Sequence, residues 1–167
     1  MIGGTRSGLP RSGSYTRSVS ESRTVLLIED SVEDADLVTA MLGKSADAFR
    51  CEWARTLADG CAKVRERPPA CVLLDLDLTD GDGPAALDAV VSAAPALPVI
   101  VLTGRDDPVL GEDALRRGAQ DYLDKGWTNQ RLLTRAVRNA ARRNGNCVRP
   151  NVGFPPPWRR RSTASAC

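Results

Sequence analysis

Short hydrophobic runs alternate along the chain with segments in which apolar residues recur every three or four positions. Runs at 25–28, 71–74 and 99–102 are typical of strands buried on both faces of a parallel sheet, and 49–54 and 122–123 are weaker candidates. The periodic segments predict helices after Ser31 up to Gly43, after Thr56 up to Pro68, from Pro84, over 109–117, and around 132–141. Five such units with short connections predict an α/β fold, a doubly wound parallel sheet covered by helices on both sides.

Two segments without this pattern flank the body in which predicted strands and helices alternate. Residues 1–23 are rich in serine, glycine and arginine, and residues 144–167 contain a proline triplet followed by Trp158 and three arginines. Neither segment has enough apolar surface to offset the entropy cost of ordering. We therefore expect one folded domain at 24–143 between two disordered tails.

Composition excludes several classes of chemistry. The 167 residues include no histidine, which rules out histidine-ligated zinc and catalysis by serine–histidine or cysteine–histidine pairs. The five cysteines form neither a metal-binding pair motif nor a disulfide framework. No apolar run approaches the about 18 residues of a membrane span, and the N-terminus lacks a signal-peptide pattern. These features predict a cytoplasmic protein without membrane insertion.

The net charge of +2 conceals a strong asymmetry. Residues 24–128 hold 20 acidic and 10 basic side chains, whereas both ends of the chain are basic. An acidic body argues against nucleic acid as a partner, although Trp158 and the arginines after it could contact phosphates. Five arginines lie largely on one face of the last helix, and their simplest interpretation is a solvated surface, with docking of an acidic partner as the alternative; they are Arg131, Arg135, Arg138, Arg142 and Arg143.

Polar residues follow four of the predicted strands. Glu29 and Asp30 come after the first strand, Asp75 after the third, Thr103 after the fourth and Lys125 after the fifth. Ligands of doubly wound sheets bind at the carboxyl ends of the strands, so we expect these side chains to converge. Three carboxylates in one crevice favour a bound divalent cation, and oxygen ligands suit Mg²⁺. With a hydroxyl and an ammonium opposite, the set predicts phosphoryl transfer onto a carboxylate.

Several motifs in order carry a family resemblance. They are Glu29-Asp30, Leu73-Leu74-Asp75-Leu76, Thr79-Asp80-Gly81-Asp82-Gly83, Val101-Leu102-Thr103-Gly104 and Gly118-Ala119-Gln120-Asp121-Tyr122-Leu123-Asp124-Lys125. Residues 24–143 thereby resemble the receiver domain of two-component response regulators, of the single-domain CheY-like kind. The resemblance implies a flavodoxin-like fold with strand order 2-1-3-4-5.

The resemblance also implies roles for the acidic residues. Asp75 would accept a phosphoryl group from a sensor histidine kinase or a histidine phosphotransfer protein. Asp30, Asp75 and the backbone carbonyl of Asp77 would bind Mg²⁺ directly, and Glu29 would hold the ion mainly through water. The domain would catalyse only its own phosphorylation and dephosphorylation, and would not act as an enzyme on other molecules.

The remaining site residues would pass the signal on. Lys125 would pair with the phosphoryl oxygens, Thr103 would hydrogen-bond one of them, and Tyr122 would turn inward as Thr103 moves. This shift would remodel the surface of the fourth helix, fifth strand and fifth helix, where a downstream protein or a second copy of the chain would dock.

Two departures from the family pattern change the expectation. Gly126 stands where many members have a proline after the lysine, so a trans peptide is expected there. No output domain is recognisable in the sequence, which suggests a stand-alone receiver.

Three alternatives remain open from the sequence. Asp75-Leu76-Asp77-Leu78-Thr79 fits the nucleophile motif of haloacid dehalogenase-like phosphatases, but the acids that this family places after its lysine are missing beyond Asp124. A dinucleotide-binding domain would need a glycine-rich turn where Glu29-Asp30-Ser31 stands. A pseudo-receiver that binds partners without phosphorylation is disfavoured because the expected site residues are present.

Overall fold

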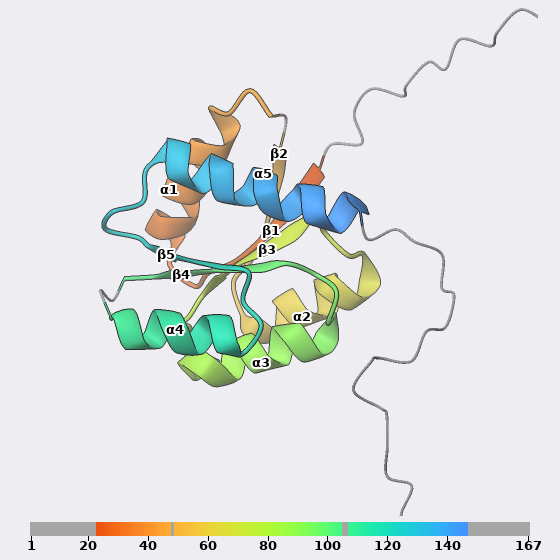
Figure 1. Cartoon of the computed structure of the whole chain (residues 1–167), viewed down its shortest axis with the longest axis vertical. Coiled ribbons are helices and arrows are strands. Elements are labelled where there is room, and N and C mark those ends of the chain that lie inside the picture. Colours follow the sequence, from red (N-terminus) through yellow and green to blue (C-terminus); the bar gives the residue numbers. More distant parts are fainter. Residues whose placement is uncertain (1–22, 48, 105–106, 147–167) are drawn as a thin grey trace, which may run out of the picture.

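Strands and helices alternate from one end of the described chain to the other. The computed structural model describes residues 23–47, 49–104 and 107–146. The elements are β1 (Arg23–Ile28), α1 (Val32–Gly43), β2 (Phe49–Ala54), α2 (Leu57–Glu66), β3 (Cys71–Asp75), α3 (Gly83–Ala93), β4 (Val99–Thr103), α4 (Pro108–Arg116), β5 (Asp121–Asp124) and α5 (Gln130–Asn146). The strands form one parallel sheet in the order β2-β1-β3-β4-β5, which confirms the predicted flavodoxin-like topology (Figure 1).

The sheet lies between two layers of helices. Helices α1 and α5 cover one face, and α2, α3 and α4 cover the other (Figure 1). Side chains of a strand point alternately to the two faces, so in β1 Val25 and Leu27 join the core under α1 and α5, while Leu26 and Ile28 join the opposite core. Because both faces are covered, every residue of β3 and β4 is buried. This burial explains the uninterrupted hydrophobic runs of the sequence.

Local capping sets several helix boundaries. The Ser31 hydroxyl accepts a hydrogen bond from the backbone N–H of Asp34 at 3.3 Å, and the Thr56 hydroxyl accepts one from Asp59 at 3.1 Å. Each bond satisfies an N–H group that the first turn of a helix leaves without an intrahelical partner. Gly118 follows α4 with φ at +107°, a backbone conformation that is energetically unfavourable for residues with a Cβ atom. The predicted helix starts after Ser31 and Thr56 are thus confirmed.

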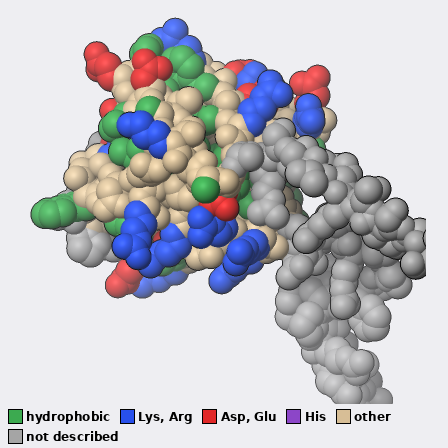
Figure 2. Space-filling model, turned by 90° about the horizontal axis from the view of Figure 1, so that it is seen from above, with side chains coloured by type: hydrophobic (Ala, Val, Ile, Leu, Met, Phe, Trp, Pro, Cys, Tyr) green, Lys and Arg blue, Asp and Glu red, His purple; other side chains and the backbone are tan. Residues whose placement is uncertain are grey.

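The outer face of α5 is basic, as its sequence suggests. Arg131, Arg135, Arg142 and Arg143 are exposed, whereas Arg138 is partly covered and its Nε atom donates to Asp47 Oδ2 at 2.8 Å. Figure 2 looks onto the side of the molecule covered by α1 and α5 and shows basic side chains gathered there.

The folded region extends slightly beyond the expected limit. Helix α5 continues to Asn146, and the side-chain amide of Asn144 donates to the backbone carbonyls of Pro69 and Ala70, at 3.1 Å each. Most of the two predicted tails lies outside the described residues, so their disorder stays a prediction. Within the described ranges every peptide bond is trans, including the one after Lys125, and no helix is long and apolar enough to span a bilayer.

Candidate functional site

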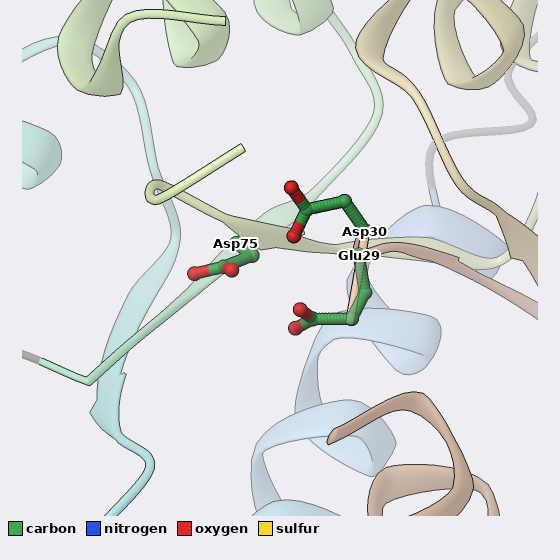
Figure 3. Close-up of side chains that lie close together, drawn as sticks. All are labelled: Glu29, Asp30 and Asp75. Atoms are coloured by element: carbon green, nitrogen blue, oxygen red, sulfur yellow. The ribbon is translucent and has the colours of Figure 1, made fainter. Parts of the chain in front are cut away.

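Three carboxylates meet at the carboxyl edge of the sheet. Glu29 and Asp30 follow β1, Asp75 ends the neighbouring strand β3, and the pairing of Ile28 with Leu74 brings these positions side by side. One oxygen from each of the three carboxylates lies within 4.8 Å of the others, and in Figure 3 the carboxylates of Glu29 and Asp30 point toward Asp75. Oxygen donors at this spacing are the ligand type that Mg²⁺ prefers.

Backbone N–H groups orient each of the three carboxylates. Glu29 Oε1 accepts from Ser31 N at 3.2 Å, and Asp30 Oδ2 accepts from Thr79 N at 3.0 Å. Asp75 Oδ1 accepts from the N–H of Asp77 at 3.2 Å, which places Asp77 directly beside the predicted phosphoacceptor. The loop after β3 therefore holds two of the three acids in place.

Within the part of the chain that the structure describes, Lys125 is the cation that faces this cluster. The backbone N–H of Lys125 donates to Thr103 O at 2.7 Å, which sets the start of its loop against the end of β4. From there its ammonium lies 2.7 Å from Glu29 Oε2 and 3.1 Å from Asp75 Oδ2. One ammonium cannot neutralise three carboxylates, so the described side chains of the site retain negative charge that a divalent cation would balance.

Burial shapes the protonation of the pair formed by Glu29 and Lys125. Glu29 is fully buried, and this desolvation raises its pKa to about 7, although the hydrogen bond from Lys125 opposes the rise. Burial by itself would lower the pKa of Lys125, but its hydrogen bonds to Asp34 and Glu29 outweigh that effect and hold its pKa above the usual value. The lysine therefore stays charged, and it favours the ionised form of Glu29.

Thr103 and Tyr122 connect the site to α4. Thr103 is the buried last residue of β4. The Tyr122 hydroxyl donates to the backbone carbonyl of Asp107 at 3.4 Å, and its ring packs so closely on Gly111 that a Cβ atom there would lie 3.1 Å from it. Burial raises the pKa of this hydroxyl, and hydrogen bonds with Asp107 and Thr103 limit the rise. Tyr122 thus contacts both the end of β4 and the start of α4.

Asp34 and Trp53 also contact the site, although the sequence predicts a role for neither residue. Asp34, in the first turn of α1, places Oδ2 at 2.7 Å from the Lys125 ammonium. The indole N–H of Trp53 in β2 donates to the backbone carbonyl of Glu29 at 2.7 Å. An acid in a first helical turn is an ordinary feature that complements the helix dipole, so nothing in the local pattern of Asp34 signals its contact with a distant lysine.

Comparison with known proteins identifies the same family across most of the described chain. The response regulator receiver domain family matches residues 25–137. Among curated relatives, the acid tolerance regulatory protein ActR of Rhizobium meliloti is 29% identical over 125 residues, or 75% of this chain and 63% of the relative. The photosynthetic apparatus regulatory protein RegA of Rhodobacter capsulatus is 33% identical over 107 residues, or 64% of this chain and 57% of the relative. The chain therefore spans about three fifths of these relatives.

Solved structures agree with this family and with the fold. The receiver domain of NtrX from Brucella abortus, 28% identical, superposes with a TM-score of 0.64 over 71% of this chain and 98% of that one. A CheY-like receiver domain protein from Methanospirillum hungatei, 22% identical, gives a TM-score of 0.66 over 74% of this chain and 97% of that one and supports the fold alone. Neither the phosphatase nor the dinucleotide-binding alternative is the family found. The chain belongs to the response regulator receiver domain family, whose members are signalling domains.

Proposed function

We propose that the chain accepts a phosphoryl group on Asp75 from a histidine kinase or a histidine phosphotransfer protein in a Mg²⁺-dependent reaction. The observation that carries this proposal is the setting of Asp75, a buried carboxylate that shares a crevice with Glu29 and Asp30 and has the Lys125 ammonium at 3.1 Å. Membership of the receiver family supports the choice of phosphoryl donor.

The carboxylate cluster fits a magnesium ion. Asp30, Asp75 and the backbone carbonyl of Asp77 would hold the ion, with Glu29 acting through water. When bound, Mg²⁺ would supply positive charge against the oxygens of the incoming phosphoryl group. The fit rests on the donor set, because among the described side chains three carboxylates with one facing ammonium leave a negative site of hard oxygen ligands.

The chain's own residues would perform the transfer largely by position and charge. A carboxylate oxygen of Asp75 attacks the phosphorus of a phosphohistidine, a P–O bond forms, and the P–N bond breaks as its electron pair returns to the imidazole of the donor. Asp77 N–H fixes the carboxylate through the 3.2 Å bond to Oδ1. Lys125 then neutralises charge on the phosphoryl oxygens, and the Thr103 hydroxyl donates a hydrogen bond to one of them.

The contacts of Tyr122 support signalling through the surface formed by α4, β5 and α5. A Thr103 hydroxyl drawn toward the phosphoryl group would leave Tyr122, whose other hydrogen bond reaches Asp107 at the start of α4. Rotation of the ring would then change how α4 packs on β5. A downstream protein or a second copy of the chain would read this change, and the domain would catalyse no reaction beyond its own phosphorylation and dephosphorylation.

A cytoplasmic location is part of the same proposal. Within the described ranges Cys51, Cys61 and Cys71 are free thiols, as expected in a reducing compartment. The stand-alone character expected from the sequence stays a prediction, because the matched region covers only part of each curated relative.

Labelling with acetyl phosphate and Mg²⁺ tests the phosphoacceptor. We expect intact-mass spectrometry to show one added phosphoryl group on the wild type and none on Asp75→Asn. Asp82→Asn is the matched control, because Asp82 is an exposed acid that caps no backbone N–H of α3. Equal labelling of Asp75→Asn and the wild type would mean that another residue accepts the phosphoryl group.

A further inference from the structure

Lys125 contacts one carboxylate that the proposed phosphoryl transfer does not require. Its ammonium lies 2.7 Å from Asp34 Oδ2, as close as it lies to Glu29. Asp34 belongs to α1, so this contact joins the end of β5 to a helix on the sheet face opposite to α4. The three acidic partners of Lys125 differ in exposure: the side chain of Asp34 is 43% exposed, whereas those of Glu29 and Asp75 are 0% and 3% exposed.

A phosphoryl group on Asp75 would compete with the other acids for Lys125. The ammonium donates hydrogen bonds to Glu29 and Asp34, and Asp75 Oδ2 lies 3.1 Å away. A phosphoryl group carries more negative charge than the carboxylate it is attached to, so it would draw the ammonium toward its oxygens. The partner released at the least cost is the one that water can solvate afterwards. Glu29 is enclosed, so Asp34 is that partner.

We propose that Asp34 is a positioning residue that holds Lys125 in the unphosphorylated protein and releases it when the phosphoryl group arrives. This inference rests on the proposed function of Asp75. Release of Asp34 breaks a link between β5 and the first turn of α1. Phosphorylation therefore changes contacts at α1 as well as on the side of the sheet that α4 covers.

The test measures binding of beryllofluoride, a non-covalent phosphoryl analogue, in the presence of Mg²⁺. Trp53 is the fluorescent reporter, because its indole donates to the Glu29 carbonyl. Trp127→Phe and Trp158→Phe in every variant remove the other two tryptophans of the sequence. Asp34→Asn removes the competing charge with little change in shape. We expect Asp34→Asn to reach half-saturation at a beryllofluoride concentration about two- to fivefold lower than the wild type. This factor corresponds to the loss of a partly exposed ion pair.

Glu33→Gln is the matched control for charge alone. Glu33 is exposed in the same helical turn, and Lys125 contacts Asp34 instead. Unchanged affinity in this control together with tighter binding by Asp34→Asn supports the exchange. Equal tightening in both variants means a general electrostatic effect and overturns it, as does unchanged affinity in Asp34→Asn.

Hydrogen exchange of the backbone amides at 35–38 provides a readout that charge alone would not move. In the wild type, beryllofluoride with Mg²⁺ should lower the protection of this turn, and in Asp34→Asn protection should already be low without it. Protection that does not respond in the wild type contradicts the release of Asp34. The proposed function of Asp75 and the proposed role of Asp34 fail in different ways. A wild type that neither binds beryllofluoride nor is labelled on Asp75 overturns both proposals. Normal labelling of Asp75, with Asp34→Asn behaving like the wild type in both measurements, overturns the role of Asp34 alone.

Discussion

Replacing Lys125 with methionine should destabilise the metal-free protein, and the loss should be larger at pH 8 than at pH 5. Methionine keeps an unbranched stem of similar length, so the substitution mainly removes the ammonium. What remains is Glu29, 0% exposed, without the cation that lies 2.7 Å from it in the wild type.

The expected loss at pH 8 is about 3 kcal/mol. Removing one partner of a buried ion pair costs about 3–5 kcal/mol, and the side chain of Lys125 is 19% exposed, which favours the lower end. At pH 5 Glu29 carries a proton in the folded protein, so only hydrogen bonds and the weaker attraction to the other carboxylates are lost. We expect about 1–2 kcal/mol there.

The sign of this pH dependence follows from the raised pKa of Glu29. Burial raises that pKa from 4.5 to about 7, and the bond from Lys125 opposes the rise, so removing the lysine moves the pKa higher still. A carboxyl group with a raised pKa binds its proton more tightly in the folded state than in the unfolded state. Its stabilising contribution is complete below pH 4.5 and is lost as the pH rises through the folded-state pKa. The wild type weakens in the same way up to its Glu29 pKa of about 7, so the additional loss of the variant grows above that pH and is larger at pH 8 than at pH 5.

Urea unfolding followed by circular dichroism, with a chelator to remove divalent cations, measures these free energies. Lys63→Met is the matched control, because Lys63 forms a more exposed ion pair with Asp59 at 3.3 Å and should lose at most about 0.5 kcal/mol at either pH. The double variant Glu29→Gln/Lys125→Met removes both charges and should recover most of the loss at pH 8. Equal losses at the two pH values, or a double variant no more stable than Lys125→Met alone, would refute the argument.

Two further predictions concern packing and a surface ion pair. Gly60→Ala should lower the free energy of unfolding, measured in urea, by about 1–2 kcal/mol, because a Cβ atom there would lie 2.7 Å from Ile28 Cγ1. Gly43→Ala is the control: a Cβ atom there meets open space, so the free energy of unfolding should not fall. The hydrogen bond from the Arg138 guanidinium holds the pKa of Asp47 below its usual value. The pair therefore stabilises the fold above the unfolded-state pKa of Asp47. This stabilisation is lost as the pH falls through the folded-state pKa. Asp47→Asn should cost about 0.2–1 kcal/mol at pH 7 and less at pH 3 in thermal denaturation, and a larger cost at pH 3 would contradict this assignment.

Much of the architecture can be read from local sequence. The run at 25–28 indicates a strand covered on both faces, and Ser31 and Thr56 mark helix starts that their hydrogen bonds confirm. Strand β5 is the exception, since only 122–123 stands out although the strand spans Asp121–Asp124. It is an edge strand paired with β4 alone, and its residues are only partly buried, so its hydrophobic pattern is weak.

The sequence also predicts which residues form the site, because parallel strands bring their carboxyl ends to one edge of the sheet. That rule suffices to predict that Glu29, Asp30 and Asp75 lie close together. It cannot say that Glu29 is fully buried while its neighbour Asp30 is only partly so. The difference depends on which side of the strand end the helices cover.

Tertiary packing alone decided that Asp34 shares the lysine and that Trp53 binds the backbone carbonyl of Glu29. Asp34 and Lys125 are 91 positions apart, and Trp53 lies 24 positions from the carbonyl that it contacts. Periodicity reports whether a residue faces the core, since that depends on neighbours within a few positions. Contacts between elements depend instead on how a helix is set on the sheet and on where each long side chain ends, and these are properties of the packed molecule.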